Sequence, residues 1–156
     1  MMQRPEKAEY YLNIAKEVLK RGTCLRRNYG AVIVNNDEIV GTGYTGSPRG
    51  TQNCCDVGIC QREELNIPSG ERYELCRSIH AEMNAVIHAG RYNCIGATLY
   101  ITGMEYKTEK LVASTEPCAL CRRVIINAGI ATVIGLVESG EIVIYPVEQW
   151  ISDSLK

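Results

Sequence analysis

Two short segments of the chain hold residue types that could bind a metal ion and move protons. The first reads HAE at residues 80–82, and the second reads PCALC at residues 117–121. Cysteines three residues apart at the start of a helix can both reach one ion, and helix N-terminal amides lower the pKa of a thiol. A histidine from elsewhere completes three protein ligands and leaves the fourth position to water. This is the pattern of a catalytic zinc ion, with His80, Cys118 and Cys121 as its ligands.

Glu82 lies two residues after His80, so both side chains can lie on the first turn of one helix. A carboxylate at this place can take a proton from zinc-bound water and return it to a substrate nitrogen. The order H-x-E followed by P-C-x-x-C is the signature of the zinc deaminases, in which the glutamate is an acid/base and not a ligand. Alone, a CxxC pair also fits a redox site or half of a structural zinc site. Together the two segments predict catalytic zinc, with Glu82 as the catalytic residue.

The composition limits the other possibilities. A chain of 156 residues with 46% hydrophobic residues predicts a single domain over 1–156 with a real core. The net charge of −1 disfavours a nucleic-acid polymer as partner, although a small anion needs only a few local cations. Charges interrupt the N-terminal apolar runs, and no run is long enough to span a membrane. We therefore expect a cytoplasmic protein without a membrane partner, whose eight cysteines serve as ligands, nucleophiles or buried thiols.

Hydrophobic periodicity predicts which elements carry these residues. Helices are expected at about residues 6–21, 78–91 and 118–128 and after 146, and strands at 31–35, 38–44, 97–102, 131–137 and 142–145. Residues 46–77 form a long connection, and residues 103–114 a charged excursion with room for a short hairpin. The excursion is either a surface or subunit-contact loop or a flap over a site. Strands alternating with helices predict an α/β fold, a three-layer α/β/α domain around a mixed sheet of about five strands.

Over about residues 8–135 the chain resembles the deoxycytidylate (dCMP) deaminases of the cytidine deaminase-like superfamily. Besides the two metal segments, the resemblance rests on CLRR at 24–27, GAVIV at 30–34, GYTGSPRG at 43–50, PSGERYELC at 68–76 and IINAGI at 125–130. It implies a cytidine deaminase-like fold and a zinc-dependent hydrolase (EC 3.5.4.12). The implied reaction converts dCMP to dUMP and ammonia and supplies dUMP for thymidylate synthesis.

The resemblance also implies substrate contacts. The backbone N–H of Ala81 would meet the base carbonyl, and Thr45 stands where family members commonly have an asparagine that contacts the nucleotide. Since an anion in a pocket needs cations, Arg26, Arg27 and Arg49 are candidates for the phosphate. Arg26 and Arg49 are favoured because they flank the first strands, although each could equally be a solvated surface charge. A hydroxyl at 45 lacks the paired donor and acceptor of an amide.

Some phage dCMP deaminases that the chain resembles hold a second, structural zinc ion with cysteines that match Cys24 and Cys54. Cys60 and Cys76 could complete a four-cysteine set, and Cys55 could replace Cys54. A metal ion would order the long connection. The alternative is that these are free, partly buried thiols.

Allosteric members of the family bind dCTP and dTTP, with Mg²⁺ on the effector nucleotide, at positions that match His88 and Arg91. Arg91 could equally balance the dipole at a helix end. The resemblance further implies a homohexamer. Two alternatives stay open: a deaminase of another cytosine nucleotide or nucleoside or of a modified dCMP, and a non-catalytic zinc-binding protein of the same fold.

Overall fold

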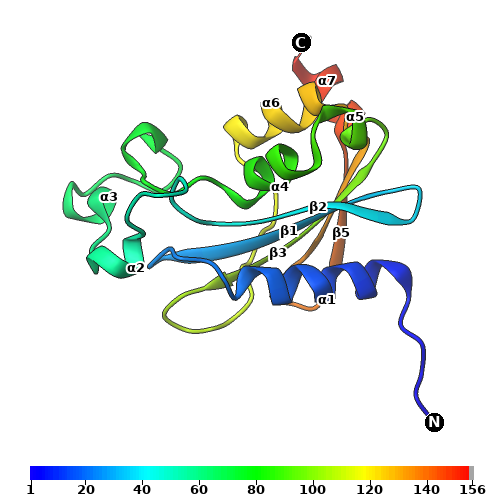
Figure 1. Ribbon diagram of the computed structural model, residues 1–156, viewed down its shortest axis with the longest axis horizontal. Coiled ribbons are helices and arrows are strands. Elements are labelled where there is room, and N and C mark those ends of the chain that lie inside the picture. Colours follow the sequence, from blue (N-terminus) through cyan, green and yellow to red (C-terminus); the bar gives the residue numbers. More distant parts are fainter. Residues whose placement is uncertain (155–156) are drawn as a thin grey trace.

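The computed structural model describes residues 1–154, which form a five-stranded mixed sheet between two layers of helices (Figure 1). The strands are β1 (Arg27–Asn35), β2 (Glu38–Tyr44), β3 (Thr98–Glu105), β4 (Thr132–Leu136) and β5 (Ile142–Pro146), in the order β2-β1-β3-β4-β5. The pair β3 and β4 is parallel, and the other neighbours are antiparallel. This confirms the predicted α/β fold with a mixed sheet.

The helices divide between the two faces of the sheet. Helix α1 (Lys7–Leu19) covers one face, while α4 (Ala81–Ala89) and α6 (Ala119–Ala128) cover the other, together with α5 (Arg91–Cys94) and α7 (Val147–Ser154) (Figure 1). A buried core lies on each side, one beneath α1 and the larger one beneath α4, α5 and α6. None of the helices in residues 1–154 is long and apolar enough to serve as a membrane span.

Two glycines let the helices approach the sheet closely. A Cβ at Gly30 in β1 would overlap backbone atoms of Ala15 in α1. A Cβ at Gly43 in β2 would overlap the backbone of Ala81 and Ala85 in α4. The close packing of α4 on β2 therefore depends on the absence of a side chain at Gly43. This packing matters for the site because α4 begins directly after His80.

The connection over residues 46–77 holds only short elements: α2 (Cys54–Val57), α3 (Gln61–Glu64) and the 3₁₀ turn η1 (Tyr73–Leu75). It projects beyond one end of the sheet in Figure 1. The structure therefore agrees with the prediction of a long connection with little regular structure.

The expectation that residues 103–114 lie wholly outside the sheet was wrong for its first part. Strand β3 continues to Glu105 because β1 begins earlier than predicted, at Arg27, and these two residues pair. The rest folds back as a tight turn, with an isolated bridge between Met104 and Leu111. The predicted short hairpin is thus present at the end of β3.

Candidate metal centre

His80 lies at the junction of the connection with α4, where it is the N-cap residue in extended conformation. The chain just before it is fixed to the end of β2. Ile79 and Gly46 exchange backbone hydrogen bonds of 2.7 and 3.2 Å, and the amide of Asn84 donates to the carbonyl of Tyr44 at 2.9 Å. The start of α4 is therefore held by the sheet and not by the connection alone.

The two cysteines lie at the start of α6. Cys118 is the N-cap residue, and its sulfur accepts a hydrogen bond from the backbone N–H of Cys121 at 3.5 Å. Cys121 is fully buried in the first turn of the helix. Arg122 fixes the approach to the helix, because its Nε donates to the carbonyl of Pro117 at 2.9 Å.

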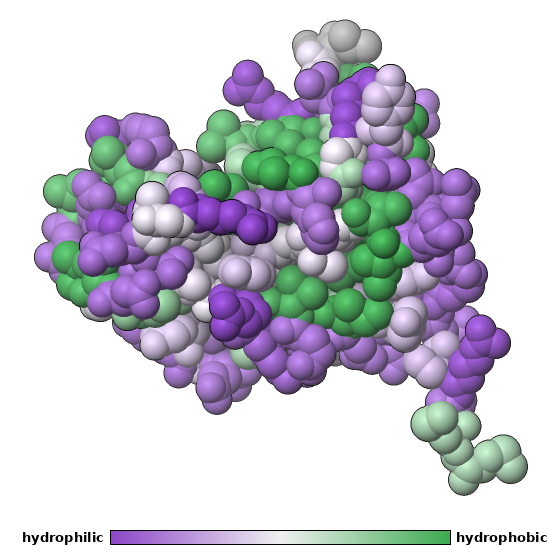
Figure 2. Space-filling model, viewed as in Figure 1, coloured by the Kyte–Doolittle hydropathy of each residue, from purple (hydrophilic) through white to green (hydrophobic). Residues whose placement is uncertain are grey.

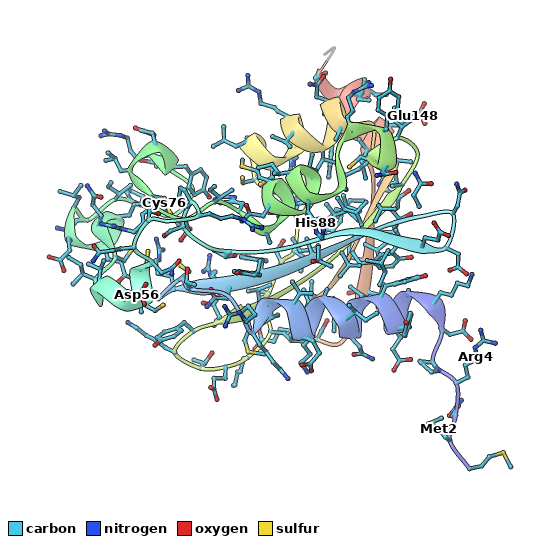
Figure 3. The ribbon with its side chains drawn as sticks, viewed as in Figure 1. Met2, Arg4, Asp56, Cys76, His88 and Glu148 are labelled. Atoms are coloured by element: carbon cyan, nitrogen blue, oxygen red, sulfur yellow. The ribbon has the colours of Figure 1, made fainter. Side chains whose placement is uncertain are left out.

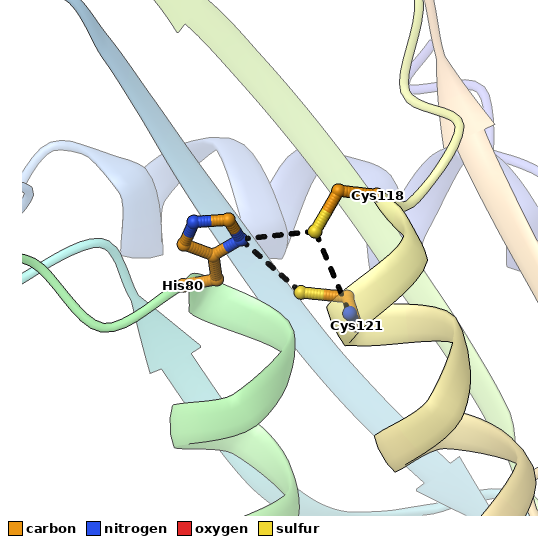
Figure 4. A group of neighbouring side chains, drawn as sticks. All are labelled: His80, Cys118 and Cys121. Carbon is orange, nitrogen blue, oxygen red and sulfur yellow. Dashed lines mark hydrogen bonds between the residues drawn. The ribbon is translucent and has the colours of Figure 1, made fainter. Parts of the chain in front are cut away.

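The two helix starts bring His80, Cys118 and Cys121 together (Figure 4). Their ligand atoms all lie within 4.8 Å of one another, and within residues 1–154 no other group of three or more potential ligands meets this spacing. Nδ1 of His80 lies 3.2 Å from Sγ of Cys121 and 3.5 Å from Sγ of Cys118. One nitrogen and two sulfurs suit a zinc ion with a fourth position for water. The donor set therefore fits the metal that the sequence predicts.

The electrostatics of the three groups favour metal binding. Hydrogen bonds from Cys121 and His80 lower the pKa of the Cys118 thiol to about 4, so this sulfur is a thiolate at neutral pH. The interaction with Cys118 and burial raise the pKa of the Cys121 thiol, which therefore keeps its proton while no metal is bound. A coordinated zinc ion deprotonates such a thiol outright. The Cys118 sulfur is therefore ready to bind a metal ion, and the buried Cys121 thiol would lose its proton on binding.

Glu82 lies in the first turn of α4 and is 6% exposed. Its Oε2 accepts a hydrogen bond from Sγ of Cys121 at 3.4 Å, so the carboxylate stands beside the ligands. Burial raises the pKa of Glu82 above the usual range. A carboxyl with a raised pKa beside a metal site can both accept and donate a proton near neutral pH.

A cavity of about 310 Å³ opens over this group. His80, Glu82 and Cys118 line it, and the rest of its walls come from β1 and the loop before it, the end of β2, the connection and the segment before α6. A volume of this size is at the lower end of the range for small-molecule sites. The arrangement can hold one small molecule against a metal-activated water.

The whole site segment matches a known family. The family described as "Cytidine and deoxycytidylate deaminase zinc-binding region" matches residues 5–137. The chain belongs to this family. Its zinc-binding description agrees with the His80, Cys118 and Cys121 group, and the predicted zinc cofactor is confirmed.

Individual relatives support the same family. The chain is 36% identical over 138 residues to the deoxycytidylate deaminase of Mycobacterium phage D29, covering 85% of this chain and 96% of that protein. It is 32% identical to the deoxycytidylate deaminase of Schizosaccharomyces pombe, covering 84% of this chain but only 37% of that longer protein. The crystal structure of dCMP deaminase from the cyanophage S-TIM5 in apo form aligns with a TM-score of 0.57 and 25% identity, over 85% of this chain and 84% of that chain.

The residues predicted to contact the substrate do not all lie at the cavity. Thr45 is buried in the cavity wall, and its Oγ1 accepts a hydrogen bond from the backbone N–H of Tyr29 at 3.0 Å. Arg26 lines the cavity and lies 3.5 Å from a carboxylate oxygen of Glu63. Ala81 is fully buried as the first residue of α4, where its N–H has no acceptor within the helix. The structure does not place Arg49 with them, because it is exposed and lies outside the cavity lining.

The four-cysteine cluster of Cys24, Cys54, Cys60 and Cys76 gathers at the base of the connection. Burial raises the pKa of the Cys24 and Cys54 thiols, and the nearby Cys60 and Cys76 add to both shifts. All eight cysteines of the chain are free thiols. The four sulfurs are therefore neighbours, but they are less tightly grouped than the ligands at His80.

The two predicted effector residues lie away from the cavity. His88 is exposed on α4, and the backbone N–H of Thr42 donates to its Nδ1 at 3.0 Å. Figure 3 shows His88 on α4 and Cys76 in the connection, at separate places on the molecule. The Nε of Arg91 donates to the carbonyl of Asn127 at 3.1 Å, so it joins α5 to the end of α6. Their role with effectors stays a prediction.

Sequence reasoning missed several residues of the cavity wall, among them Arg62 and Tyr73. Tyr73 belongs to the segment at 68–76 on which the resemblance rests, but the resemblance gave this residue no function. Arg62 lies in a stretch with neither periodicity nor motif. Its burial follows only from the way the connection folds.

Proposed function

We propose that the chain hydrolyses dCMP to dUMP and ammonia. The observation that carries the proposal is the placement of Glu82 beside a three-ligand zinc group at the wall of one cavity. The relatives named deoxycytidylate deaminase, one of them matched over nearly its full length, support dCMP as the substrate.

The chain's own residues divide the reaction between them. When zinc is bound by His80, Cys118 and Cys121, it supplies a water of lowered pKa as nucleophile. Glu82 takes a proton from the water that attacks C4 of the cytosine ring. It passes this proton to N3, then takes the remaining proton of the added O–H and gives it to the exocyclic amine, which leaves as ammonia while the C4 carbonyl forms. Water is consumed, and no redox partner is needed.

The cavity walls hold the nucleotide in this proposal. The free N–H of Ala81 at the start of α4 is a donor for the base carbonyl. Thr45 lines the cavity, and its hydroxyl oxygen accepts a hydrogen bond from the backbone N–H of Tyr29. The hydroxyl proton is left to donate to the nucleotide. Arg26 adds positive charge to the cavity wall, and the nearby carboxylate of Glu63 offsets part of that charge. Arg49 is exposed and outside the cavity lining, so it is given no contact in this proposal.

The test is turnover by the purified, zinc-loaded protein. We expect dCMP to be preferred over CMP, deoxycytidine, cytidine and 5-substituted dCMP, with dUMP and ammonia formed in equal amounts. A preference for another member of the panel would move the proposal to that substrate. Turnover of none of them by a protein that holds zinc would favour the non-catalytic alternative.

We further propose that the four-cysteine cluster binds a structural zinc ion. Its support is that four free thiols from separate parts of the chain meet where the connection has little apolar core of its own. A small closing movement would be needed, because the sulfurs are not yet at ligand spacing. Two zinc equivalents per chain are expected by elemental analysis, and one equivalent would contradict this proposal.

The remaining expectations concern assembly and regulation. We propose a single domain over 1–156, a homohexamer and a cytoplasmic location, the last supported by the eight free thiols. Apolar side chains gather over α4 in Figure 2, and Ile87 of this helix is 73% exposed, which suits a subunit contact. Light scattering tests the assembly. Adding dCTP or dTTP with Mg²⁺ to the turnover assay tests regulation through His88 and Arg91.

A further inference from the structure

Arg62 is a buried cation in the wall of the metal cavity. It belongs to α3 and is 6% exposed. Its Nε donates to the carbonyl of Glu71 at 3.1 Å, and its Nη2 donates to the carbonyl of Pro68 at 3.0 Å. These two bonds fix the guanidinium plane against the chain at residues 68–71. They leave the rest of its five N–H donors for another partner.

No carboxylate neutralises Arg62. Among the ion pairs of residues 1–154, none includes it. The other two arginines of the cavity wall differ in this respect, because Arg26 lies near Glu63 at 3.5 Å and Arg27 binds Glu105 at 2.7 Å. A buried charge without a counter-ion is costly. Arg62 is therefore the cavity cation with the greatest need of an anion.

Two contacts of the Tyr73 ring connect Arg62 to the metal centre. Its Cζ lies 4.9 Å from the ring centroid of Tyr73, over the ring face. The Tyr73 ring meets the His80 imidazole edge to face, with centroids 4.9 Å apart and planes at 88°. The distance from the guanidinium to the imidazole of His80 is thus at most the sum of these two contacts. A nucleotide has its reacting base at one end and its phosphate at the other, and this separation suits both ends at once.

We propose that Arg62 receives the phosphate of the nucleotide and so makes the site specific for a nucleoside monophosphate. The inference rests on the proposed function, and it names a residue outside those expected from the sequence. The bonds to Glu71 and Pro68 preorganise the guanidinium fork, which pairs with phosphate oxygens in a bidentate manner. Tyr73 keeps water from one face of the guanidinium. The Ser69 hydroxyl, which also lines the cavity, can add one further donor.

A merely structural role for Arg62 would be to hold the turn at residues 68–71. That role predicts equal damage to all ligands of the cavity, together with a lower unfolding temperature. Phosphate recognition predicts damage that depends on the phosphate. The two roles are therefore separated by ligands that differ only in this group.

The test compares inhibition by dUMP and by deoxyuridine in Arg62→Gln, Arg62→Lys and the unchanged protein. We expect the inhibition constant of dUMP to rise by about tenfold or more in Arg62→Gln, from the loss of charge-assisted hydrogen bonds. The constant for deoxyuridine should stay within about twofold. Arg62→Lys keeps the charge without the fork and should fall between. KM for dCMP should rise with little change in kcat.

The matched control is Arg72→Gln, in the same connection, where the arginine is exposed and binds Glu74 instead of lining this cavity. It should leave both inhibition constants unchanged. An unchanged dUMP constant in Arg62→Gln, or an equal rise for dUMP and deoxyuridine, would overturn the inference. Failure of the proposed function is seen separately, because the unchanged protein would then not turn over dCMP. Calorimetric titration with inorganic phosphate gives the same comparison without catalysis.

Discussion

The metal centre and the four-cysteine cluster both depend on cysteines, yet the fold holds them differently. At the metal centre, Cys118 and Cys121 stand at the start of a ten-residue helix, and His80 at the start of a nine-residue helix. Both helices pack on the central sheet. In the cluster, the cysteines come from a loop before β1 and from a connection whose helices are four residues long or shorter.

This difference shows how ligand spacing is obtained. Helix starts fixed to a sheet bring three ligand atoms within 4.8 Å without help from an ion. The connection brings its thiols into one neighbourhood, but at a wider spacing than the ligands at His80. A site of the first kind is preorganised for catalysis, whereas a site of the second kind couples metal binding to folding.

The largest effect is expected from removing a ligand of the preorganised site. Cys121→Ala should lose the catalytic zinc ion and all measurable turnover, because two protein ligands hold zinc poorly. A strong chelator should do the same to the unchanged protein. Cys94→Ala is the control, since Cys94 is equally buried but is the last residue of α5 and is not one of the three ligands. Full activity of Cys121→Ala would contradict the assignment of this site.

Glu82→Gln should separate metal binding from proton transfer. The amide keeps the shape of the side chain but cannot carry a proton, so kcat should fall by about 10²- to 10⁴-fold. Zinc content should stay unchanged. The exposed Glu138→Gln is the matched control. If both variants kept full turnover, Glu82 would not be the acid/base.

Cys24→Ser tests the other side of the comparison. It should remove one zinc equivalent and lower the unfolding temperature, while the equivalent at His80 remains. Cys55→Ser should change neither quantity, because Cys55 is exposed beside the cluster. A zinc content that is the same in both variants would mean that the cluster consists of free thiols.

Gly43→Ala tests the claim that the sheet positions α4. The added methyl group would overlap the backbone of this helix and should cost about 1–3 kcal/mol of unfolding free energy. Gly46→Ala is the control, since its Cβ would approach only side-chain atoms, the nearest being an atom of the Tyr44 ring at 3.3 Å. Chemical denaturation measures both. Equal stabilities would show that α4 can move away from β2 without cost.

The smallest effect is expected far from both regions. Tyr11 donates a hydrogen bond of 2.8 Å to Asp37, and Lys7 binds the same carboxylate at 3.0 Å. Lys7 first and Tyr11 second lower the pKa of Asp37, so their stabilising effect is present above the usual carboxyl pKa and is lost as the pH falls through the lowered value. Tyr11→Phe should therefore lower the unfolding temperature slightly at neutral pH and less in acid. A deficit independent of pH would exclude this bond as the cause.

The sequence predicted the sheet and its main helices because their apolar periods are regular. It misjudged the end of β3, since the pairing of Glu105 with Arg27 depends on where another strand begins. The sequence located the metal group, because the spacing of Cys118 and Cys121 on one helix turn, together with the HAE motif at His80, is typical of this kind of zinc site. It did not locate Arg62, whose neighbours at residues 68–71 and 73 are joined to it only by the folded connection.

By itself, the sequence determined the family, the zinc ligands and the candidate acid/base, since short-range spacing fixes which groups share a helix start. The tertiary structure alone decided that Arg62 is buried and lacks a carboxylate, whereas Arg26 and Arg27 have one and Arg49 lies outside the cavity. The physical reason is that the environment of a charge depends on what packs around it. Packing joins segments that no local pattern connects.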